Sequence, residues 1–460
     1  MDRRSVLKSL SASTAVAASG VLSTPVAAAS GRRPNFVIVL CDDLGYGDLT
    51  SFGGRIFKTP NVDRLAREGT ALTDYYAPAN LCTPSRAGLL TGRYPIRTGL
   101  GYEVIMQDDT RGLPLSEVTI AKALKPHYAT GLFGKWHLGH IAPYWPPTQH
   151  GFDHFFGIPY SHDMKPLSLY ESHAGSDEVA SFPVDYPQLQ QQFYEHAERF
   201  IEQNKDVPFF VELALSAPHL PEYPHRPFAG TTAGGSYGDV VVEIDSIVGR
   251  LLAKLRQLHL ERDTLVIFTS DNGPWFEGST GGLRDRKGGA AFDGGYRVPF
   301  IARQPGVIPA DRRVDSIVSG IDILPTFCAM AGQPLPPGIV LDGRDIADVL
   351  LHGGPSPHDG IVLFDNEDVV GIRTQRWKYV SGAYYRSVGL VPFARMGYTE
   401  LYDMKVDPSE SYSVAASHPD VAEDMRARFG RAQATFAVFK HQELPPVFQR
   451  MKGQPRHMQD

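Results

Sequence analysis

Cysteine is scarce in this chain of 460 residues, with only Cys41, Cys82 and Cys328 present. So few cysteines exclude a disulfide scaffold, and one possible pair would still leave an odd residue. The chain has no surplus of basic charge that would indicate nucleic-acid binding, because its formal net charge is −6. It also has no apolar run long enough to span a membrane. What remains is the ordinary composition of a folded globular protein.

The first 29 residues have the order of an export signal. A basic stretch with paired arginines, Arg3 and Arg4, is followed by small and apolar residues that end in three alanines at 27–29. This order is typical of a secretory signal peptide, and the arginine pair is typical of the bacterial twin-arginine type. We therefore expect residues 1–29 to be a signal peptide and the mature protein to be periplasmic or secreted. An uncleaved N-terminal tail is the alternative.

Buried strands and amphipathic helices alternate from residue 35 onward. Continuous apolar runs predict strands buried on both faces, at residues 35–41, 128–133, 208–216 and 265–270. A helix is predicted from Pro60 to Gly69 with Thr59 as its cap, and a long amphipathic helix over 237–258. This alternation predicts an α/β fold, in which helices sandwich a large, mixed and mainly parallel sheet.

The C-terminal part of the chain has a different pattern. Proline and glycine cluster between about 333 and 357, which indicates a domain boundary. Short strands are expected at 371–380 and 399–404, before a helix that begins near residue 419, and a loose polar tail is expected from about 445. We therefore predict a large α/β domain over residues 30–350. A smaller α+β domain, with a short antiparallel sheet and a helix, is predicted over residues 351–460.

Polar and charged side chains follow the carboxyl ends of the predicted strands. They are Asp42, Asp43, Lys135, His137, His219, Asp271 and Asn272. Ligand sites of open parallel sheets form at that edge, so we expect these side chains to converge there. The oxygens of Asp42, Asp43, Asp271 and Asn272 suit a hard cation, Ca²⁺ or Mg²⁺, better than zinc. Each pair alone is common in plain turns, but two pairs at one edge favour a metal site.

Cys82 opens the segment Cys82-Thr83-Pro84-Ser85-Arg86. Pro84 suits the first turn of a helix, so Cys82 is expected near a helix N-terminus, where backbone N–H groups favour anions. Arg86, one turn further on, would reach the same face. These residues leave two readings open, a reactive nucleophile and an inert buried cysteine. The spacing of three residues between Cys82 and Arg86 excludes a cysteine-phosphatase loop, which has five.

Residues 82–92, CTPSRAGLLTG, resemble the signature of the formylglycine-dependent sulfatase family, in the alkaline phosphatase superfamily. Residues 42–48, DDLGYGD, are similar to its metal motif, and residues 134–139, GKWHLG, to its second signature. Residues 157–163, GIPYSHD, resemble the arylsulfatase A branch in particular. A C-terminal motif of the family is matched over residues 401–410. The resemblance extends over nearly the whole mature chain.

This resemblance implies a sulfuric ester hydrolase that converts a sulfate ester to an alcohol and inorganic sulfate. A formylglycine-generating enzyme would oxidise Cys82 to formylglycine (3-oxoalanine). The hydrate of this aldehyde would be the nucleophile, and a sulfated enzyme the intermediate. A plain serine or cysteine has no second hydroxyl, so its sulfated form would be a dead end. Calcium, with magnesium less favoured, would be held by five side chains: Asp42, Asp43, Cys82, Asp271 and Asn272.

The resemblance also implies roles for the basic residues. Arg86 and Lys135 would hold the nucleophile, and His137 would accept the proton whose loss lets sulfate leave. His219 and Lys287 would help to protonate the leaving alcohol. Sulfate would be bound by four side chains: Lys135, Ser161, His219 and Lys287. Lys287 lies in RDRKGG, where the family has Arg-Gly-Gly-Lys-Gly-Thr or similar, so its surroundings depart from the pattern.

Two other functions stay open at this point. A phosphodiesterase or phosphonate monoester hydrolase of the same superfamily would have the same signature, since sulfate and phosphate share their shape. A non-catalytic, exported ion- or glycan-binding protein would keep Cys82 as a thiol. Aryl, glycan and lipid sulfates all remain candidate substrates, because loops outside the motifs set specificity. Six further histidines are expected to be solvated loop residues: His127, His140, His150, His154, His162 and His225.

Overall fold

The computed structural model describes residues 32–384, 390–392, 398–443 and 446. The predicted signal peptide and nearly all of the predicted loose tail lie outside the described residues, so both stay predictions. Within the described ranges, no helix combines the length and the apolarity that a bilayer crossing requires.

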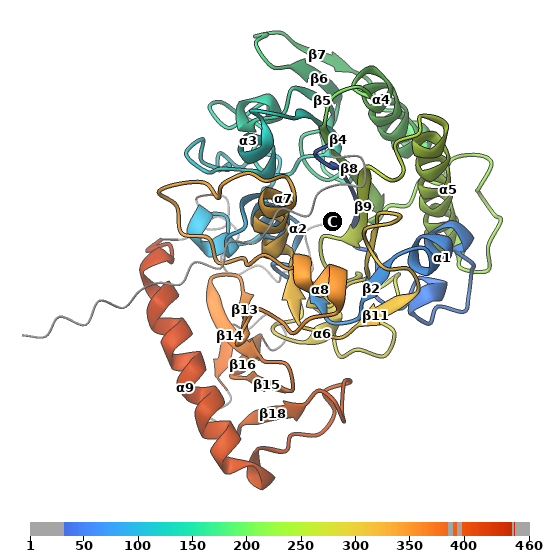
Figure 1. Ribbon diagram of the computed structural model, residues 1–460. Helices are drawn as coiled ribbons and strands as arrows, with labels where there is room; N and C mark the ends of the chain where they lie inside the picture. Colours follow the sequence, from blue (N-terminus) through green and yellow to red (C-terminus); the bar gives the residue numbers. More distant parts are fainter. Residues whose placement is uncertain (1–31, 385–389, 393–397, 444–445, 447–460) are drawn as a thin grey trace, which may run out of the picture.

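A ten-stranded sheet is the centre of the larger part of the molecule (Figure 1). Its strands are β1 (Asn35–Asp42), β2 (Thr70–Leu72), β4 (Ala129–Lys135), β5 (His154–Ile158), β6 (Leu169–His173), β7 (Val179–Phe182), β8 (Phe209–Pro218), β9 (Thr264–Ser270), β10 (Phe300–Arg303) and β11 (Arg312–Val314). Their order is β11-β2-β10-β9-β1-β8-β4-β5-β6-β7. The five central strands from β9 to β5 are parallel, whereas β10 and β6 are antiparallel to both of their neighbours. The predicted large, mainly parallel mixed sheet is therefore confirmed.

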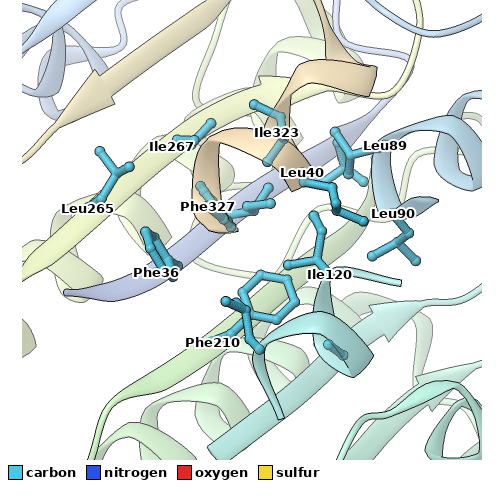
Figure 2. Packing of buried hydrophobic residues seen from close by; sticks show 14 of the residues in the cluster. Phe36, Leu40, Leu89, Leu90, Ile120, Phe210, Leu265, Ile267, Ile323 and Phe327 are labelled. Carbon is cyan, nitrogen blue, oxygen red and sulfur yellow. The ribbon is translucent and has the colours of Figure 1, made fainter. Parts of the chain in front are cut away.

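Helices cover both faces of this sheet. They are α1 (Pro60–Arg67), α2 (Cys82–Thr91), α3 (Ile120–Leu124), α4 (Leu189–Gln203), α5 (Gly235–Gln257), α7 (Ile323–Met330) and α8 (Ala347–His352). Phe36, Ile38 and Leu40 of β1 pack with α2, α3, α7 and α8 in one core, part of which is shown in Figure 2. Val37 and Val39 point the opposite way and pack with α1, α4 and α5. Each such side chain stabilises the fold by about 1.5–3 kcal/mol on burial.

The predicted start of the first helix at Pro60, after Thr59, is confirmed, whereas its end and the hydrogen bond of its cap differ from the prediction. α1 ends at Arg67, two residues before Gly69, and the side chain of Thr59 makes no capping hydrogen bond. The Thr59 hydroxyl is instead 3.2 Å from that of Thr50 and accepts the Thr50 amide at 3.1 Å. A tertiary partner has therefore taken the side chain that local sequence assigned to the helix cap.

The smaller part of the molecule is a four-stranded antiparallel sheet with one long helix against it (Figure 1). Its elements are β13 (Ile361–Asp365), β14 (Asp368–Arg373), β15 (Trp377–Val380), β18 (Glu400–Asp403) and α9 (Pro419–Phe436). The single strand predicted over 371–380 is two strands, because the chain turns where the Thr374 amide donates to the Trp377 carbonyl at 2.8 Å. Two-stranded pairs are formed by β3 (Tyr75–Tyr76) with β12 (Val318–Ser319), and by β16 (Gly382–Tyr384) with β17 (Leu390–Pro392).

A buried ion cluster joins the small sheet to the rest of the molecule. Lys378 Nζ of β15 lies 2.6 Å from Asp293 Oδ1, in the short helix α6 (Asp293–Tyr296), and 2.7 Å from Glu410 Oε1. All three side chains are inaccessible to solvent. Burial raises the pKa of Glu410 to about 7. Burial acts the same way on Asp293, but the Lys378 ammonium outweighs it and holds the pKa of Asp293 below its usual value. Lys378 therefore serves both carboxyl groups, and Arg297 is a second cation for Asp293 at 3.5 Å.

Candidate active site

The side chains predicted from the strand ends lie together at the carboxyl edge of the sheet. Asp42 is the last residue of β1 and Lys135 the last of β4, while His219 follows β8 and Asp271 follows β9. Asp42, Lys135 and Asp271 are almost inaccessible to solvent. The order β9-β1-β8-β4 makes these four strand ends neighbours, although they span about half of the sequence.

Cys82 is the first residue of α2, as the position of Pro84 predicts. Its Sγ lies 3.3 Å from Asp42 Oδ1 and 3.8 Å from Asp43 Oδ1. The helix N-terminus therefore points at the edge of the sheet and brings its free backbone N–H groups with it. Cys41, Cys82 and Cys328 are all buried free thiols, so the one disulfide that the sequence allowed does not form.

A set of oxygen donors surrounds the Cys82 sulfur. One carboxylate oxygen each of Asp42, Asp43 and Asp271 lies within 4.8 Å of the others and of this sulfur. Asn272 Nδ2 donates to Asp43 Oδ1 at 2.7 Å, which leaves Asn272 Oδ1 buried without a hydrogen-bond partner. A buried, unpartnered acceptor beside three carboxylates fits a hard cation such as Ca²⁺ or Mg²⁺.

Each carboxylate of this set is paired with a different basic side chain. The pairs are Lys135 Nζ with Asp42 Oδ2 at 2.6 Å, Lys287 Nζ with Asp43 Oδ2 at 2.7 Å, and Arg86 Nε with Asp271 Oδ2 at 2.9 Å. Arg86 also donates to the Lys135 carbonyl at 2.9 Å, which ties α2 to the end of β4. Lys287 reaches the site from the loop between β9 and α6, despite its altered neighbours.

A glycine places Lys135 at the edge. Gly134 has a φ of +127°, a conformation that side-chain-bearing residues rarely adopt. A Cβ atom at this position would lie 1.8 Å from the carbonyl oxygen of Ala214 on the neighbouring strand β8. Only glycine lets the two backbones approach this closely just before the lysine, which explains why the Gly-Lys pair forms part of a local motif.

The pKa values of two acidic groups of the site are shifted in opposite directions. Burial would raise the pKa of Asp42, but Lys135, His219 and Arg86 outweigh it and hold this pKa well below its usual value. Asp271 differs, because burial and the nearby charge of Asp42 raise its pKa to about 7 despite the partner Arg86. A divalent cation next to Asp271 would favour the ionised form of this buried carboxyl group.

The Cys82 thiol is a poor nucleophile in this environment. Burial raises its pKa well above the usual value, and the charge of Asp42 raises it further. Activated cysteines have the opposite shift, because the thiolate is the reactive form. The protein groups around Cys82 therefore do not by themselves favour its thiolate form.

His137 lies just after β4 with its imidazole buried. Its Nε2 donates to the Ile105 carbonyl at 2.9 Å, because a carbonyl oxygen can only accept. Its Nδ1 therefore carries the lone pair, and this atom is buried without a hydrogen-bond partner. Burial lowers the pKa of His137 well below its usual value, and the charges of Lys135 and Arg86 lower it further. The ring is thus a neutral imidazole with a free proton-accepting atom. The Thr83 hydroxyl donates to the backbone carbonyl of His137 at 2.9 Å and so ties His137 to α2.

His219 reaches the acidic cluster from the loop after β8. Its Nε2 lies 3.6 Å from Asp43 Oδ2, and its Nδ1 donates to the Leu220 carbonyl at 2.5 Å. Ser161 is buried beyond the end of β5, next to His162, whose ring centroid lies 5.6 Å from that of His219. All the side chains expected at the site therefore lie at or beside this edge.

Three of the six histidines expected in solvated loops are not there, and one of them, His154, is the first residue of β5 with a side chain only 16% exposed. His162 and His150 are buried, with Nε2 donating to the carbonyls of Pro221 and Tyr144 at 3.0 Å. Burial lowers the pKa of both to about 4. Only the position of His162 inside the segment GIPYSHD could have indicated its place at the site. Ser85 was also missed, although its hydroxyl donates to the Asp271 carbonyl from inside the first signature.

Comparison with known proteins agrees with this geometry. A family model described as Sulfatase matches residues 34–333. Arylsulfatase A of Homo sapiens is 36% identical over 471 residues, which cover 92% of this chain and 89% of that protein. Steryl-sulfatase of Rattus norvegicus is 35% identical over 74% of each chain.

Solved structures agree as well. The PsFucS1 sulfatase from Pseudoalteromonas sp. superposes with a TM-score of 0.82 at 29% identity, over 89% of this chain and 91% of that one. A phosphonate monoester hydrolase of Agrobacterium radiobacter has a TM-score of 0.62 over 88% and 96% of the chains, and at 22% identity it shares the fold alone. The match to the family over most of the chain shows that this protein belongs to the sulfatase family and is a sulfuric ester hydrolase.

Proposed function

We propose that this sulfatase attacks its ester with an aldehyde-derived oxygen at position 82, next to a calcium ion. The observation that carries the proposal is the position of Cys82 Sγ, 3.3 Å from Asp42 and within the set of carboxylates. An oxygen that replaced this sulfur would join the metal ligands. The raised pKa of the Cys82 thiol supports the same view, because the unmodified side chain would be inert.

Calcium suits this site better than magnesium. The candidate ligands Asp42, Asp43, Asp271 and Asn272 are all buried, so the protein itself supplies most of the coordination. Magnesium usually keeps several waters and demands near-ideal octahedral geometry, whereas calcium accepts irregular sets of protein oxygens. When bound, the ion would lower the pKa of an oxygen acid held at position 82 and polarise a sulfate oxygen.

The basic residues bind and orient the reacting groups. Arg86 and Lys135 flank position 82 and offset its developing negative charge, while Lys287 and His219 lie on the Asp43 side, where they bind sulfate oxygens. Three lysine and arginine charges balance the three carboxylates, so a divalent ion leaves the centre net positive. A positive, buried centre favours an anionic substrate. Ser161 adds a hydroxyl for the sulfate or for position 82.

Maturation and export complete the proposal. Cys82 is 1% exposed, so a formylglycine-generating enzyme must reach it before the fold closes or through local opening. The twin-arginine-like segment in the first 29 residues supports export to the periplasm or beyond. An enzyme exported by that route would be oxidised before it leaves the cytoplasm.

One digest and one pair of assays test the chemistry. The tryptic peptide of residues 68–86 contains position 82, and it should be lighter than its thiol form by the exchange of sulfur for oxygen and the loss of two hydrogens. The protein should also hydrolyse an aryl sulfate far faster than the phosphate ester of the same phenol. An unmodified peptide in fully active protein would refute the mechanism. A large excess of phosphatase activity would favour the phosphodiesterase reading, and an inert, unmodified protein the ion- or glycan-binding one.

Replacing His137 with alanine should separate the two halves of the reaction. We expect the first equivalent of alcohol to be released and later turnovers to slow by about 10²–10⁴-fold, since the proton acceptor that frees sulfate is gone. A rapid-quench assay with an aryl sulfate should show a burst of one phenol per chain. His140→Ala is the matched control, because His140 lies three residues away and is partly exposed. A slow first turnover without a burst would place His137 in the attack step instead.

Removal of the metal should abolish activity. Dialysis against a chelator that prefers calcium is expected to lower kcat by at least about 10²-fold, because the ion stabilises charge in the transition state. Calcium should restore the activity more fully than magnesium. The apoprotein should also unfold at a lower temperature, since three buried carboxylates then lose their common counter-ion. Restoration by stoichiometric zinc alone would contradict the calcium assignment.

A further inference from the structure

Three histidines and one glutamate lie at the opposite end of β5 from the active site. The antiparallel pairing of β5 with β6 sets His154 opposite His173, and Phe156 opposite Glu171. Paired residues share a face of the sheet, and α4 covers this one. His196 of α4 stacks on Phe156 with ring centroids 3.5 Å apart. Two strands and one helix thus bring four potential metal ligands together.

The ligand atoms of these side chains converge on one carboxylate oxygen. Glu171 Oε1 lies 2.8 Å from His154 Nε2, 3.7 Å from His173 Nε2 and 3.8 Å from His196 Nδ1. Bonds of about 2.0–2.1 Å in a tetrahedral zinc site place the ligand atoms roughly 3.3 Å apart. Ligand atoms of His154, Glu171 and His173 all lie within 4.8 Å of one another, whereas His196 lies outside this set and would have to move closer to become the fourth ligand. Zinc would take the place of the proton that His154 and Glu171 now share.

The surroundings suit a metal ion in two ways. The four side chains line a surface hollow of about 360 Å³, which leaves room for an ion to enter. Burial lowers the pKa of His154, and it lowers that of His196 to about 4 with a further contribution from Arg199. Both rings are therefore neutral at pH 7, as metal ligands must be. Arg199 also lines the hollow and opposes a cation, whereas Glu171 and Asp153 favour one.

We propose that His154, Glu171, His173 and His196 form a second metal site that takes zinc or another divalent transition metal. Imidazole nitrogens suit such ions, whereas the active site offers oxygens that suit a harder one. The length of β5, about 13 Å at 3.3 Å per residue, separates the two sites. With His196 as the fourth ligand no coordination position stays open, so the ion would be structural. It fastens the β5–β6 edge of the sheet to α4.

Calorimetric titration with ZnCl₂ tests this site in protein already saturated with calcium. One zinc ion per chain is expected, and His173→Ala and His196→Ala should each weaken its binding by at least about 100-fold, more than the loss of an outer-shell partner costs. Cobalt(II) in place of zinc should give the intense visible absorption of a four-coordinate ion. His127→Ala is the matched control, since this exposed histidine precedes β4 at the same edge of the sheet.

The His173 variant separates the loss of a metal ligand from the loss of the fold. The His173 side chain is 59% exposed, so its replacement should leave folding and sulfatase activity unchanged in metal-free buffer with calcium. Three results would overturn the proposal: no zinc binding by the folded wild-type chain, equal weakening in His127→Ala, or loss of the zinc in Asp271→Asn with retention in both cluster variants. None of these results depends on the mechanism proposed for the active site.

Discussion

Alanine at position 82 is expected to lower kcat/KM for an aryl sulfate by at least about 10⁴-fold, the scale on which removal of a covalent nucleophile acts. Cys82 opens α2 against Asp42 and Asp43, so its replacement removes an atom that the attack and the metal site share. The fold should survive, since the change deletes only one buried sulfur atom. Steady-state kinetics with a sensitive aryl sulfate measures the loss of kcat/KM, and circular dichroism shows whether the fold survives.

Two further cysteine variants sharpen this prediction. Cys328→Ala removes a buried free thiol from α7, far in sequence from every site residue, and should change kcat/KM by less than about twofold. Cys82→Ser keeps a hydroxyl but has no aldehyde, so it should stop after at most one turnover. The mass of its 68–86 peptide must show that the serine is intact. More than a hundredth of wild-type activity in Cys82→Ala would exclude position 82 as the nucleophile.

Methionine at Lys378 is expected to destabilise the protein by about 3–5 kcal/mol, because it removes the cation paired with buried Glu410 and leaves buried Asp293 with the more distant Arg297. Lys378 is inaccessible and pairs with Asp293 at 2.6 Å and with Glu410 at 2.7 Å. Urea unfolding followed by tryptophan fluorescence reports on this region, since Trp377 is the adjacent residue. The loss should shrink as the pH falls, because protonation of the carboxyl groups removes the uncompensated charge in the folded variant.

Lys405→Met is the matched control for this substitution. Lys405 also links the C-terminal part to the larger part, through Asp315 at 2.5 Å, but both members of this pair are exposed, at 40% and 69%. Exposed ion pairs contribute about 0–1 kcal/mol, so this variant should unfold close to the wild type. Equal destabilisation by Lys378→Met and Lys405→Met would mean that burial does not increase the contribution of the Lys378 cluster to the free energy of unfolding.

Much of the architecture could be predicted because it depends on local patterns. Each buried strand of the parallel sheet appears in the sequence as a continuous apolar run. The last residue of the run shows where the strand ends. The predicted strand over 208–216, for example, ends within two residues of the end of β8. The hairpin of β14 and β15 was missed because a single turn at Thr374 divides an otherwise strand-like segment. The division into domains near residue 350 stays a prediction.

The sequence by itself determined which side chains are present at the edge of the sheet and which family they resemble. Strand ends placed Asp42, Lys135 and Asp271 at one edge, since parallel strands share their polarity. The motif from Cys82 supplied the chemistry. Both kinds of information are local, so no knowledge of packing was needed.

Only the tertiary structure decided how those side chains act on one another. The pairing of Lys287 with Asp43, the free Nδ1 of His137 and the raised pKa of Cys82 depend on burial and on neighbours far apart in the chain. The cluster of His154 with His196 and the buried charge of Lys378 depend on packing in the same way. Charge interactions vary with distance and with exclusion of water, and neither quantity exists until the chain has folded.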